Sequence, residues 1–367
     1  MSRTTLLYNV GLACLAALVI SPKLAHGVTF QEIARFDVAA SAESAGSSYI
    51  GNNPSAVAWS GSQLYIAGFN SSGAAADTAI VEITNSGATG LNAATFGSPF
   101  GVLSTPNLRG YSGMDLERGV LAAAYDDGAA DPNGIQAFDA SNNTQTWAKN
   151  ARGGSSAAHD PGFGGVDSGI AWLTFGSGRR SLQDTATGAD IYTTGDGMII
   201  TDFGESFWRD LDFDQSTGDV YMRRSNDLLK ATRTGGNSVT VSMLVDNSSN
   251  GSFVAGQNVD FMATHLFGDV VIYNDRPATG TASFADVVKL IDSSGTPLSA
   301  TFSLIGGGIP DDGVGYYDFD FDPSSQTLAL LDFNNRNVHI FQVVPEPSTF
   351  VFAIAGTAVL FGLRRWR

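Results

Sequence analysis

Short runs of alternating apolar and polar residues recur along most of this chain, and turns rich in Gly, Ser, Asn and Asp separate them. An alternation with a period of two is typical of half-buried β-strands. The clearest unit combines Asp318–Asp322, Thr327–Leu331 and Asn337–Val343, which we expect to form three consecutive antiparallel strands. Helical periodicity is almost absent between residues 28 and 343, so the sequence predicts an all-β domain.

The three-strand unit occurs six times, beginning near residues 56, 113, 165, 210, 258 and 318. This spacing is typical of propeller blades, each of which is a four-stranded antiparallel sheet. Ser238–Leu244 exemplifies a fourth strand lying in the gap between two units. We expect Val28–Val38 to complete the last blade, because closing the ring leaves only short sheet edges exposed.

At the level of pattern, the central region therefore resembles six-bladed β-propellers. The alternative is a secreted β-sandwich or jelly roll of the lectin kind, which also uses many short alternating strands. No linker divides the region, so we treat residues 28–343 as one domain.

The first 27 residues have the pattern of a secretory signal peptide. Arg3 gives a positive start, Leu6–Ile20 is apolar, and small residues near Gly27 offer a cleavage site before Val28. Cys14 lies in this segment and is the only cysteine. The processed chain would therefore have no disulfide, no thiolate zinc site and no cysteine nucleophile.

The last 24 residues, 344–367, combine three features. Pro345-Glu346-Pro347 is excluded from helices and sheet ladders by its prolines, so it should be a stiff, exposed peptide. The apolar run Phe350–Leu363 would reach only ~21 Å as a helix, which is short for a hydrocarbon core of roughly 30 Å. Arg364 and Arg365 then give a positive end that favours the cytoplasmic side.

In this order, the three features resemble the PEP-CTERM sorting tail of bacterial exopolysaccharide-associated proteins. The resemblance implies that Pro345, Glu346 and Pro347 are a sorting motif and that Arg364 and Arg365 are a membrane stop. It also implies an exosortase-type membrane protease as partner, transient insertion in the inner membrane, and then release or attachment at the cell surface. The alternative is a lasting C-terminal membrane anchor.

Charge adds a further restriction on partners. Removing both terminal segments takes Arg3, Lys23, Glu346 and three terminal arginines from 36 acidic and 20 basic residues, which leaves 35 and 15 and a net charge of about −20. So acidic a protein should repel nucleic acid and anionic lipid. The charge is compatible with solubility outside the cell, with bound Ca²⁺, or with a hydrated extracellular polysaccharide.

Aspartates at a spacing of two are the candidate metal ligands. In the triplets ending at Asp214 and Asp322, the spacing places three carboxylates on one face of a strand. Asp214 and Asp322 precede turn residues, and we expect them to cap those turns. Asp212 and Asp320 are expected to line the central channel, where they are the candidate ligands of a Ca²⁺ ion.

No catalytic constellation is visible, so the sequence predicts no catalytic residue. Outside the signal peptide, the histidines are His159, His265 and His339, in three different repeats. His159 is expected in a glycine-rich loop, and His339 in a strand, at the surface or between blades. Four tryptophans are expected in the blade cores, although exposed ones would suit sugar stacking: Trp59, Trp147, Trp172 and Trp208.

These features predict an exported protein of the cell surface or the extracellular polysaccharide matrix, sorted through its C-terminal signal. A structural or adhesive role without enzymatic activity is the main hypothesis. A metal-dependent propeller hydrolase and a carbohydrate-binding module are the alternatives.

Overall fold

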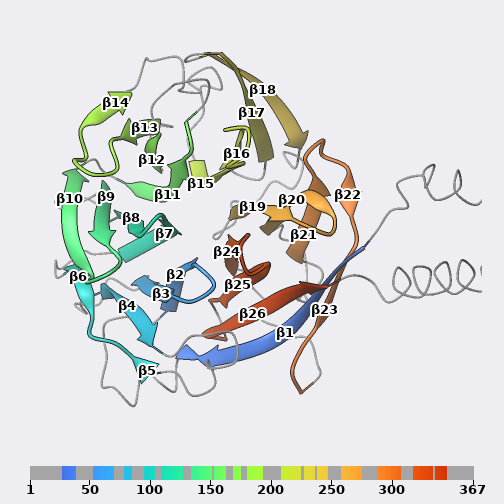
Figure 1. Cartoon of the computed structure of the whole chain (residues 1–367), viewed down its shortest axis with the longest axis horizontal. Coiled ribbons are helices and arrows are strands. Elements are labelled where there is room, and N and C mark those ends of the chain that lie inside the picture. Colours follow the sequence, from blue (N-terminus) through green and yellow to red (C-terminus); the bar gives the residue numbers. More distant parts are fainter. Residues whose placement is uncertain are drawn as a thin grey trace, which may run out of the picture.

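In the computed structural model, the described residues form 26 β-strands arranged around a central axis (Figure 1). The structure describes residues 27–38, 53–69, 78–84, 95–103, 110–126, 134–150, 153–162, 168–174, 180–192, 208–224, 227–235, 238–246, 258–274, 287–306, 317–333 and 335–344. The predicted signal peptide, apart from Gly27, lies outside these residues, as do the Pro345–Pro347 motif, the apolar run Phe350–Leu363, and Arg364 and Arg365. Among the described residues, no helix is long and apolar enough to cross a membrane.

The strands form six blades, which confirms the propeller prediction over the sandwich alternative. The first blade contains β2 (Asn53–Trp59), β3 (Leu64–Phe69) and β4 (Thr78–Thr84), with β5 (Thr95–Phe96) and β6 (Phe100–Leu103) both pairing with β4. The second contains β7 (Gly110–Glu117), β8 (Val120–Asp126), β9 (Gly134–Asp139) and β10 (Thr144–Asn150). The third contains β11 (Gly154–Asp160), β12 (Gly169–Thr174), β13 (Arg180–Gln183) and β14 (Asp190–Tyr192).

The remaining three blades follow the same order from the axis outward. The fourth contains β15 (Trp208–Phe213), β16 (Val220–Arg224), β17 (Asp227–Gly235) and β18 (Ser238–Val245), so the predicted fourth strand at Ser238 is confirmed. The fifth contains β19 (Val259–Thr264), β20 (Gly268–Asn274), β21 (Val288–Asp292) and β22 (Pro297–Leu298). The sixth contains β24 (Tyr317–Asp322), β25 (Thr327–Asp332), β26 (Asn337–Val344), β1 (Val28–Asp37) and β23 (Ala300–Ser303).

The first strand of the chain closes the ring, as predicted. β1 pairs antiparallel with β26, from Thr29 opposite Val344 to Asp37 opposite Asn337, with a register shift between Glu32 and Ala34. On its other side β1 pairs in parallel with β23, which adds a fifth strand to this blade. The two ends of the described chain are therefore held in one sheet, and the inner strands contact one another around the whole circle.

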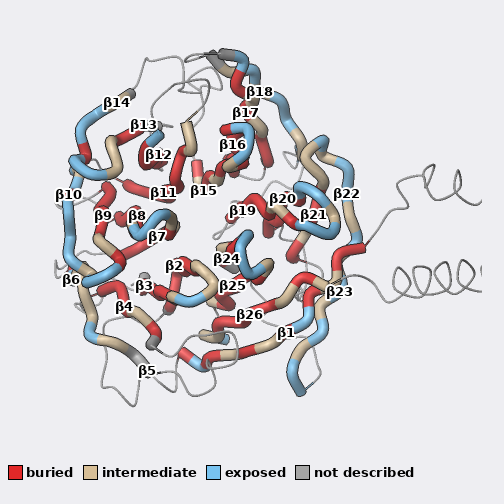
Figure 2. Tube along the Cα trace, in the orientation of Figure 1, coloured by how far each residue is buried: buried red, intermediate tan, exposed pale blue. Residues whose placement is uncertain are grey.

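The second strand of each blade explains the unbroken apolar runs in the sequence. In β25, Leu328 and Leu330 pack with residues of the fifth blade, while Ala329 and Leu331 pack with residues of the first blade. Such a strand is buried on both faces because blades cover it on both sides, so it lacks the alternation of a half-exposed strand. Outer strands such as β10 are mostly exposed or intermediate (Figure 2).

The four tryptophans between the terminal segments confirm their predicted place in the blade cores. Trp59, Trp147, Trp172 and Trp208 are between 1% and 8% exposed. Three of the ring nitrogens donate hydrogen bonds: Trp59 to Thr327 Oγ1 over 2.9 Å, Trp147 to the Thr185 carbonyl over 2.8 Å, and Trp172 to the side chain of Gln183. The four rings therefore pack inside the blades, and Trp59 also contributes to the cavity described below.

The inner strand of the third blade differs from the prediction. Its second and third strands lie where expected, but its inner strand is Gly154–Asp160, some ten residues before the expected start near residue 165. The sequence Gly-Ser-Ser-Ala-Ala-His-Asp carries small residues and lacks the bulky alternation of the other inner strands, although every residue of it is buried. His159 consequently lies in a strand and is buried, contrary to the predicted loop.

Gly154 is a position where backbone crowding requires glycine. A Cβ atom there would overlap the carbonyl oxygen of Gly134 and lie 2.8 Å from that of Tyr125. We expect Gly154→Ala to cost about 1–3 kcal/mol in urea unfolding, because neighbouring strands would have to separate. The matched control is Gly268→Ala, where nothing lies within 4 Å and only the positive φ opposes a side chain. If the two variants were equally stable, crowding at Gly154 would not be the cause.

Candidate functional site

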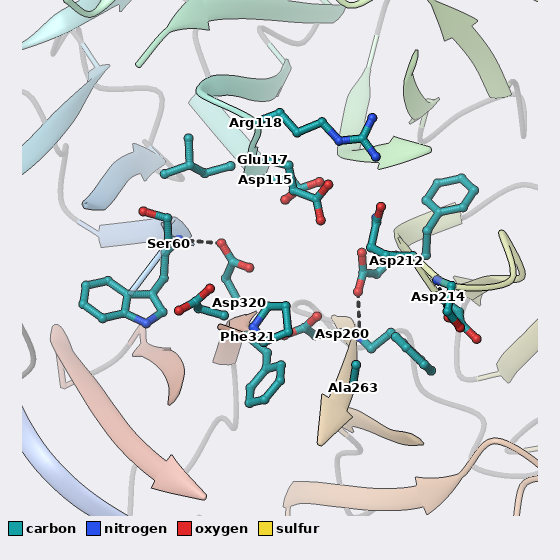
Figure 3. Close-up of a pocket in the computed structure, with 18 residues that line it drawn as sticks. Ser60, Asp115, Glu117, Arg118, Asp212, Asp214, Asp260, Ala263, Asp320 and Phe321 are labelled. Carbon is teal, nitrogen blue, oxygen red and sulfur yellow. Dashed lines mark hydrogen bonds between the residues drawn. The ribbon is translucent and has the colours of Figure 1, made fainter. Parts of the chain in front are cut away.

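A cavity of about 530 Å³ opens at the end of the channel where the inner strands end. It is lined by residues from the ends of β2, β7, β15, β19 and β24 and from the turns after them (Figure 3). Six carboxyl groups contribute from the inner strands: Asp115, Glu117, Asp212, Asp260, Asp320 and Asp322. Arg118 is the one cationic residue among the described lining residues.

The period of two places these carboxyl groups at the channel. In β15, Leu211 and Phe213 belong to a blade core, so Asp212 between them faces the other way. The same alternation puts Asp320 between the core residues Phe319 and Phe321. The sequence prediction that Asp212 and Asp320 line the channel is thus confirmed.

Several of these carboxylates also accept hydrogen bonds from the neighbouring blade. Asp115 accepts a hydrogen bond from the backbone N–H of His159 over 2.6 Å, and Asp212 accepts one from Phe261 over 2.6 Å. Asp320 accepts from the backbone N–H of Trp59 over 2.5 Å. In each case the donor belongs to the inner strand of the neighbouring blade, so the acidic residues have a structural role besides any binding role.

A deeper pair repeats this pattern two residues earlier in the strands. Asp210 accepts from the backbone N–H of Val259 over 2.7 Å, and Asp318 accepts from that of Val57 over 2.7 Å. Asp318 also accepts from the side-chain amide of Asn258. The alternating aspartates of β15 and β24 therefore bond to the neighbouring inner strands at two successive levels.

Burial raises the pKa values of several acidic residues at or near the cavity. Burial, with the nearby charge of Asp115, raises the pKa of Glu117 to about 8. Burial raises the pKa of Asp212 to about 6 and that of Asp210 to about 7. It also raises the pKa values of Asp260 and Asp320 well above the ordinary range for aspartate. The cavity therefore holds protons on some of its carboxyl groups at neutral pH.

Asp212 and Asp260 form a hydrogen-bonded carboxyl pair. Such a bond requires a proton on one of them, since two carboxylates can only accept. The Asp260 residue is 5% exposed, and its Oδ2 atom has no hydrogen-bond partner among the described residues. Asp260 therefore brings an unsatisfied oxygen to the cavity wall.

His159 lies behind the cavity and bonds to one of its carboxylates. Its Nδ1 atom is 2.9 Å from Asp115 Oδ2, and its carbonyl accepts from Gln215 over 2.8 Å. Burial opposes protonation of His159, but the charge and hydrogen bond of Asp115, with the charge of Glu117, outweigh it and raise its pKa. The third blade thus contributes to the site through Asp115, without itself lining the cavity.

The predicted turn caps are confirmed. Asp214 accepts from the backbone N–H of Ser216 over 2.8 Å, and Asp322 accepts from that of Ser325 over 2.8 Å. The side chains of Ser216 and Ser324 add further hydrogen bonds to these two carboxylates. These bonds hold the β15–β16 and β24–β25 turns that form the rim of the cavity.

The Ca²⁺ site that the sequence predicts at Asp212 and Asp320 stays a prediction. Within the described ranges, no group of three or more His, Cys, Asp or Glu side chains has an arrangement that could hold a metal ion. Asp212 and Asp320 each give one oxygen to a backbone N–H of the neighbouring blade.

Sequence reasoning missed Asp115, Glu117 and Asp260 as site residues. Asp115 and Asp260 stand at the same place in their repeats as Asp212 and Asp320, since each follows the first apolar residues of an inner strand. Aligning the six repeats on that position would have found them. Glu117 follows Asp115 by two residues, as Asp214 follows Asp212 and Asp322 follows Asp320, so the same alignment would have placed it at the cavity.

Comparison with solved structures agrees with the fold. An auxiliary nutrient binding protein from Bacteroides ovatus is 13% identical with a TM-score of 0.51, over 77% of this chain and 67% of that one. A protein of the same description from Bacteroides thetaiotaomicron is 11% identical with a TM-score of 0.48, over 77% and 66%. The β-propeller domain of Cps50 (Swd1) from Myceliophteria thermophila is 12% identical with a TM-score of 0.45, over 79% and 83%.

This chain spans about two thirds of the length of the two Bacteroides structures. No protein-family model matches the sequence, and no curated protein matches it. At 13% identity, the likeness to the Bacteroides ovatus structure extends to the fold alone.

Proposed function

We propose that this protein is exported to the cell surface or the extracellular polymer, where its propeller binds a small solute without transforming it. The observation that carries the proposal is the cavity of about 530 Å³ at the channel end. Its volume is in the range of roughly 300–1,000 Å³ that is typical of small-molecule sites. Five inner strands of one closed ring contribute to its wall, so the site is built into the fold.

The name of the Bacteroides ovatus protein supports a binding role. That protein is described as an auxiliary nutrient binding protein and shares the propeller arrangement. Transferred to this chain, the description suggests capture of a solute outside the cell. It complements the structural or adhesive role that the terminal segments suggest, because a matrix component can also bind small molecules.

The C-terminal segment supports the proposed destination. An exosortase-type membrane protease would recognise Pro345-Glu346-Pro347 while the apolar run holds the chain in the inner membrane. Mass spectrometry of the protein recovered from its own cells should find a C-terminus near this motif. An intact chain ending at Arg367 in the inner membrane would instead establish a lasting anchor.

A ligand screen tests the binding role directly. Thermal unfolding of the purified protein in the presence of neutral, cationic and anionic mono- and disaccharides, amino acids and polyamines should reveal compounds that raise the unfolding temperature. Ala263 lines the cavity, and Ala263→Trp should fill it and abolish the shift. Absence of any stabilising compound, or an undiminished shift in Ala263→Trp, would contradict binding at this site.

A hydrolase is the second candidate, and one observation favours it. Glu117 holds its proton to about pH 8 within the same cavity as Asp212, whose pKa is about 6. A neutral acid and an ionised carboxylate at one site are the arrangement used for acid–base cleavage of glycosides. Turnover of a glycan or lactone that is lost in Glu117→Gln would favour this alternative over pure binding.

A further inference from the structure

The carboxyl groups of the cavity surround a space rather than converge on one point. They come from four inner strands, β7, β15, β19 and β24 (Figure 3). The volume of about 530 Å³ is far larger than a single metal ion needs. Carboxyl groups spread around such a space suit an organic molecule that carries positive charge.

Asp260 gives an independent indication of a missing partner. Its side chain lines the cavity while the residue is only 5% exposed, and its Oδ2 atom has no hydrogen-bond partner among the described residues. An unsatisfied buried acceptor destabilises the site, and a donor from a ligand would remove this penalty. A protonated amine supplies up to three N–H donors as well as the positive charge.

We propose that the cavity binds a small organic cation through a primary ammonium group, which sits against Asp260 and Asp212 and displaces protons from the carboxyl cluster. This inference rests on the proposed function and specifies the ligand class of the same site. The exchange is balanced: R–NH₃⁺ enters, the carboxyl O–H bond breaks, and the proton passes to water while its electron pair stays on the carboxylate.

The charged groups that face the cluster determine the direction of the pH effect. Three blades place charged groups against the cluster. The second blade contributes Asp115, Glu117 and Arg118, the fourth contributes Asp210, Asp212 and Asp214, and the sixth contributes Asp318, Asp320 and Asp322. His159 lies behind Asp115. β2 contributes Trp59 and Ser60, which carry no charge. Acidic groups outnumber basic ones, so like-charge repulsion favours protonation until a cation arrives. Affinity should therefore increase as the pH rises.

Isothermal titration calorimetry of the protein purified from its own cells tests the proposal at pH 7. The probes are the glucosamine disaccharide, its di-N-acetylated form as the neutral match, spermidine and CaCl₂. We expect an amine to bind at least ~100-fold more tightly than the acetylated disaccharide. Titrations in phosphate and in HEPES buffer, neither of which carries a primary amine, should give different enthalpies, because bound ligand releases protons to the buffer. Tighter binding of the disaccharide amine would identify an amino sugar as the ligand class, and tighter binding of spermidine would identify a polyamine.

Variants and pH provide the controls. Asp260→Asn keeps the size of the side chain and should weaken the amine at least ~10-fold, while Asp37→Asn, at an exposed position at the end of β1, should not. In the unchanged protein, affinity for spermidine, which remains cationic, should increase from pH 6 to pH 8. Equal binding of the acetylated disaccharide would overturn the ammonium inference but leave the proposed function standing. Binding of Ca²⁺ alone, or of no probe, would also overturn it.

Discussion

Replacing Glu32 with alanine should cost about 3–5 kcal/mol of folding free energy, which is the range for removing one partner of a buried ion pair. The Glu32 side chain is fully buried in the strand that closes the ring. It accepts from Arg35 through two bonds of 2.8 Å and lies 2.7 Å from Nδ1 of His339. It also accepts from the backbone N–H of Ile305, just after β23. One carboxylate thus joins β1, β26 and the segment after β23.

Urea unfolding of Glu32→Ala against Arg35→Ala measures this effect with a matched control. Arg35 is 34% exposed, so its removal should cost about 1 kcal/mol or less, as is usual for exposed pairs. Burial alone would raise the pKa of Glu32, but bonds from His339, Arg35 and Ile305 lower it to about 2. Its stabilisation is therefore present above the unfolded pKa near 4.5 and is lost as the pH falls toward 2. Equal costs for the two variants would refute the central role of Glu32.

The fold could be predicted because blades repeat a pattern that depends on the period of strands alone. Six units, four strands in a unit and closure by Val28–Val38 all follow from alternation and spacing. The fifth strand β23 could not be foreseen, since Ala300–Ser303 is short and its parallel partner β1 is more than 260 residues away. The pairing of β1 with β23 depends on closure of the ring, so no local sequence pattern predicts it.

The positions of two histidines show where the local sequence pattern does not determine the secondary structure or the burial of a residue. Gly154–Asp160 consists mainly of small residues, which are typical of loops, yet this strand is buried between two blades. The small side chains allow the inner strands to pack closely at the axis. Gly113, for example, would place a Cβ 3.0 Å from the Cα of Ser156 in the next inner strand. His339 lies in a strand as predicted, and it is fully buried against Glu32, which excludes the surface position, one of its two predicted places. Its partner lies 307 residues away in the sequence, so burial could not be inferred locally.

The candidate site was predictable in part. Asp212, Asp320 and the two turn caps follow from a spacing of two, which fixes the face of the strand. The carboxyl pair of Asp212 and Asp260 was not predictable, because it joins two blades whose distance depends on closure. The raised pKa values follow from burial at the channel, which the sequence does not show.

Raising the pH from 5 to 8.5 should destabilise the protein by a few kcal/mol, at about 1.4 kcal/mol for each unit of pKa difference. Glu117, Asp212 and Asp210 keep protons in the folded state up to pKa values of about 8, 6 and 7. In the unfolded chain the same groups lose their protons near pH 4. The folded state therefore binds more protons across this interval, and stability decreases as the pH rises through it.

Carboxyl groups whose pKa values are lowered in the folded state set the lower pH limit of stability. The turn cap Asp214 accepts several hydrogen bonds, as does Asp292 in the turn between β21 and β22, and these bonds outweigh burial and lower both pKa values. Their stabilisation is complete above about pH 4 and is lost in stronger acid, so greatest stability should fall near pH 5. Urea midpoints at pH 5, 7 and 8.5 measure the decrease directly.

The double variant Glu117→Gln, Asp212→Asn identifies the cause of the decrease. Both replacements keep the size of the side chain, and the asparagine carbonyl can still accept from the N–H of Phe261. Without these two titrating groups, stability should vary much less between pH 5 and 8.5. A decrease as steep as that of the unchanged protein would assign the effect to overall negative charge. Constant or increasing stability in the unchanged protein would show that the carboxyl cluster is ionised throughout, and an ammonium ligand would then have no protons to displace.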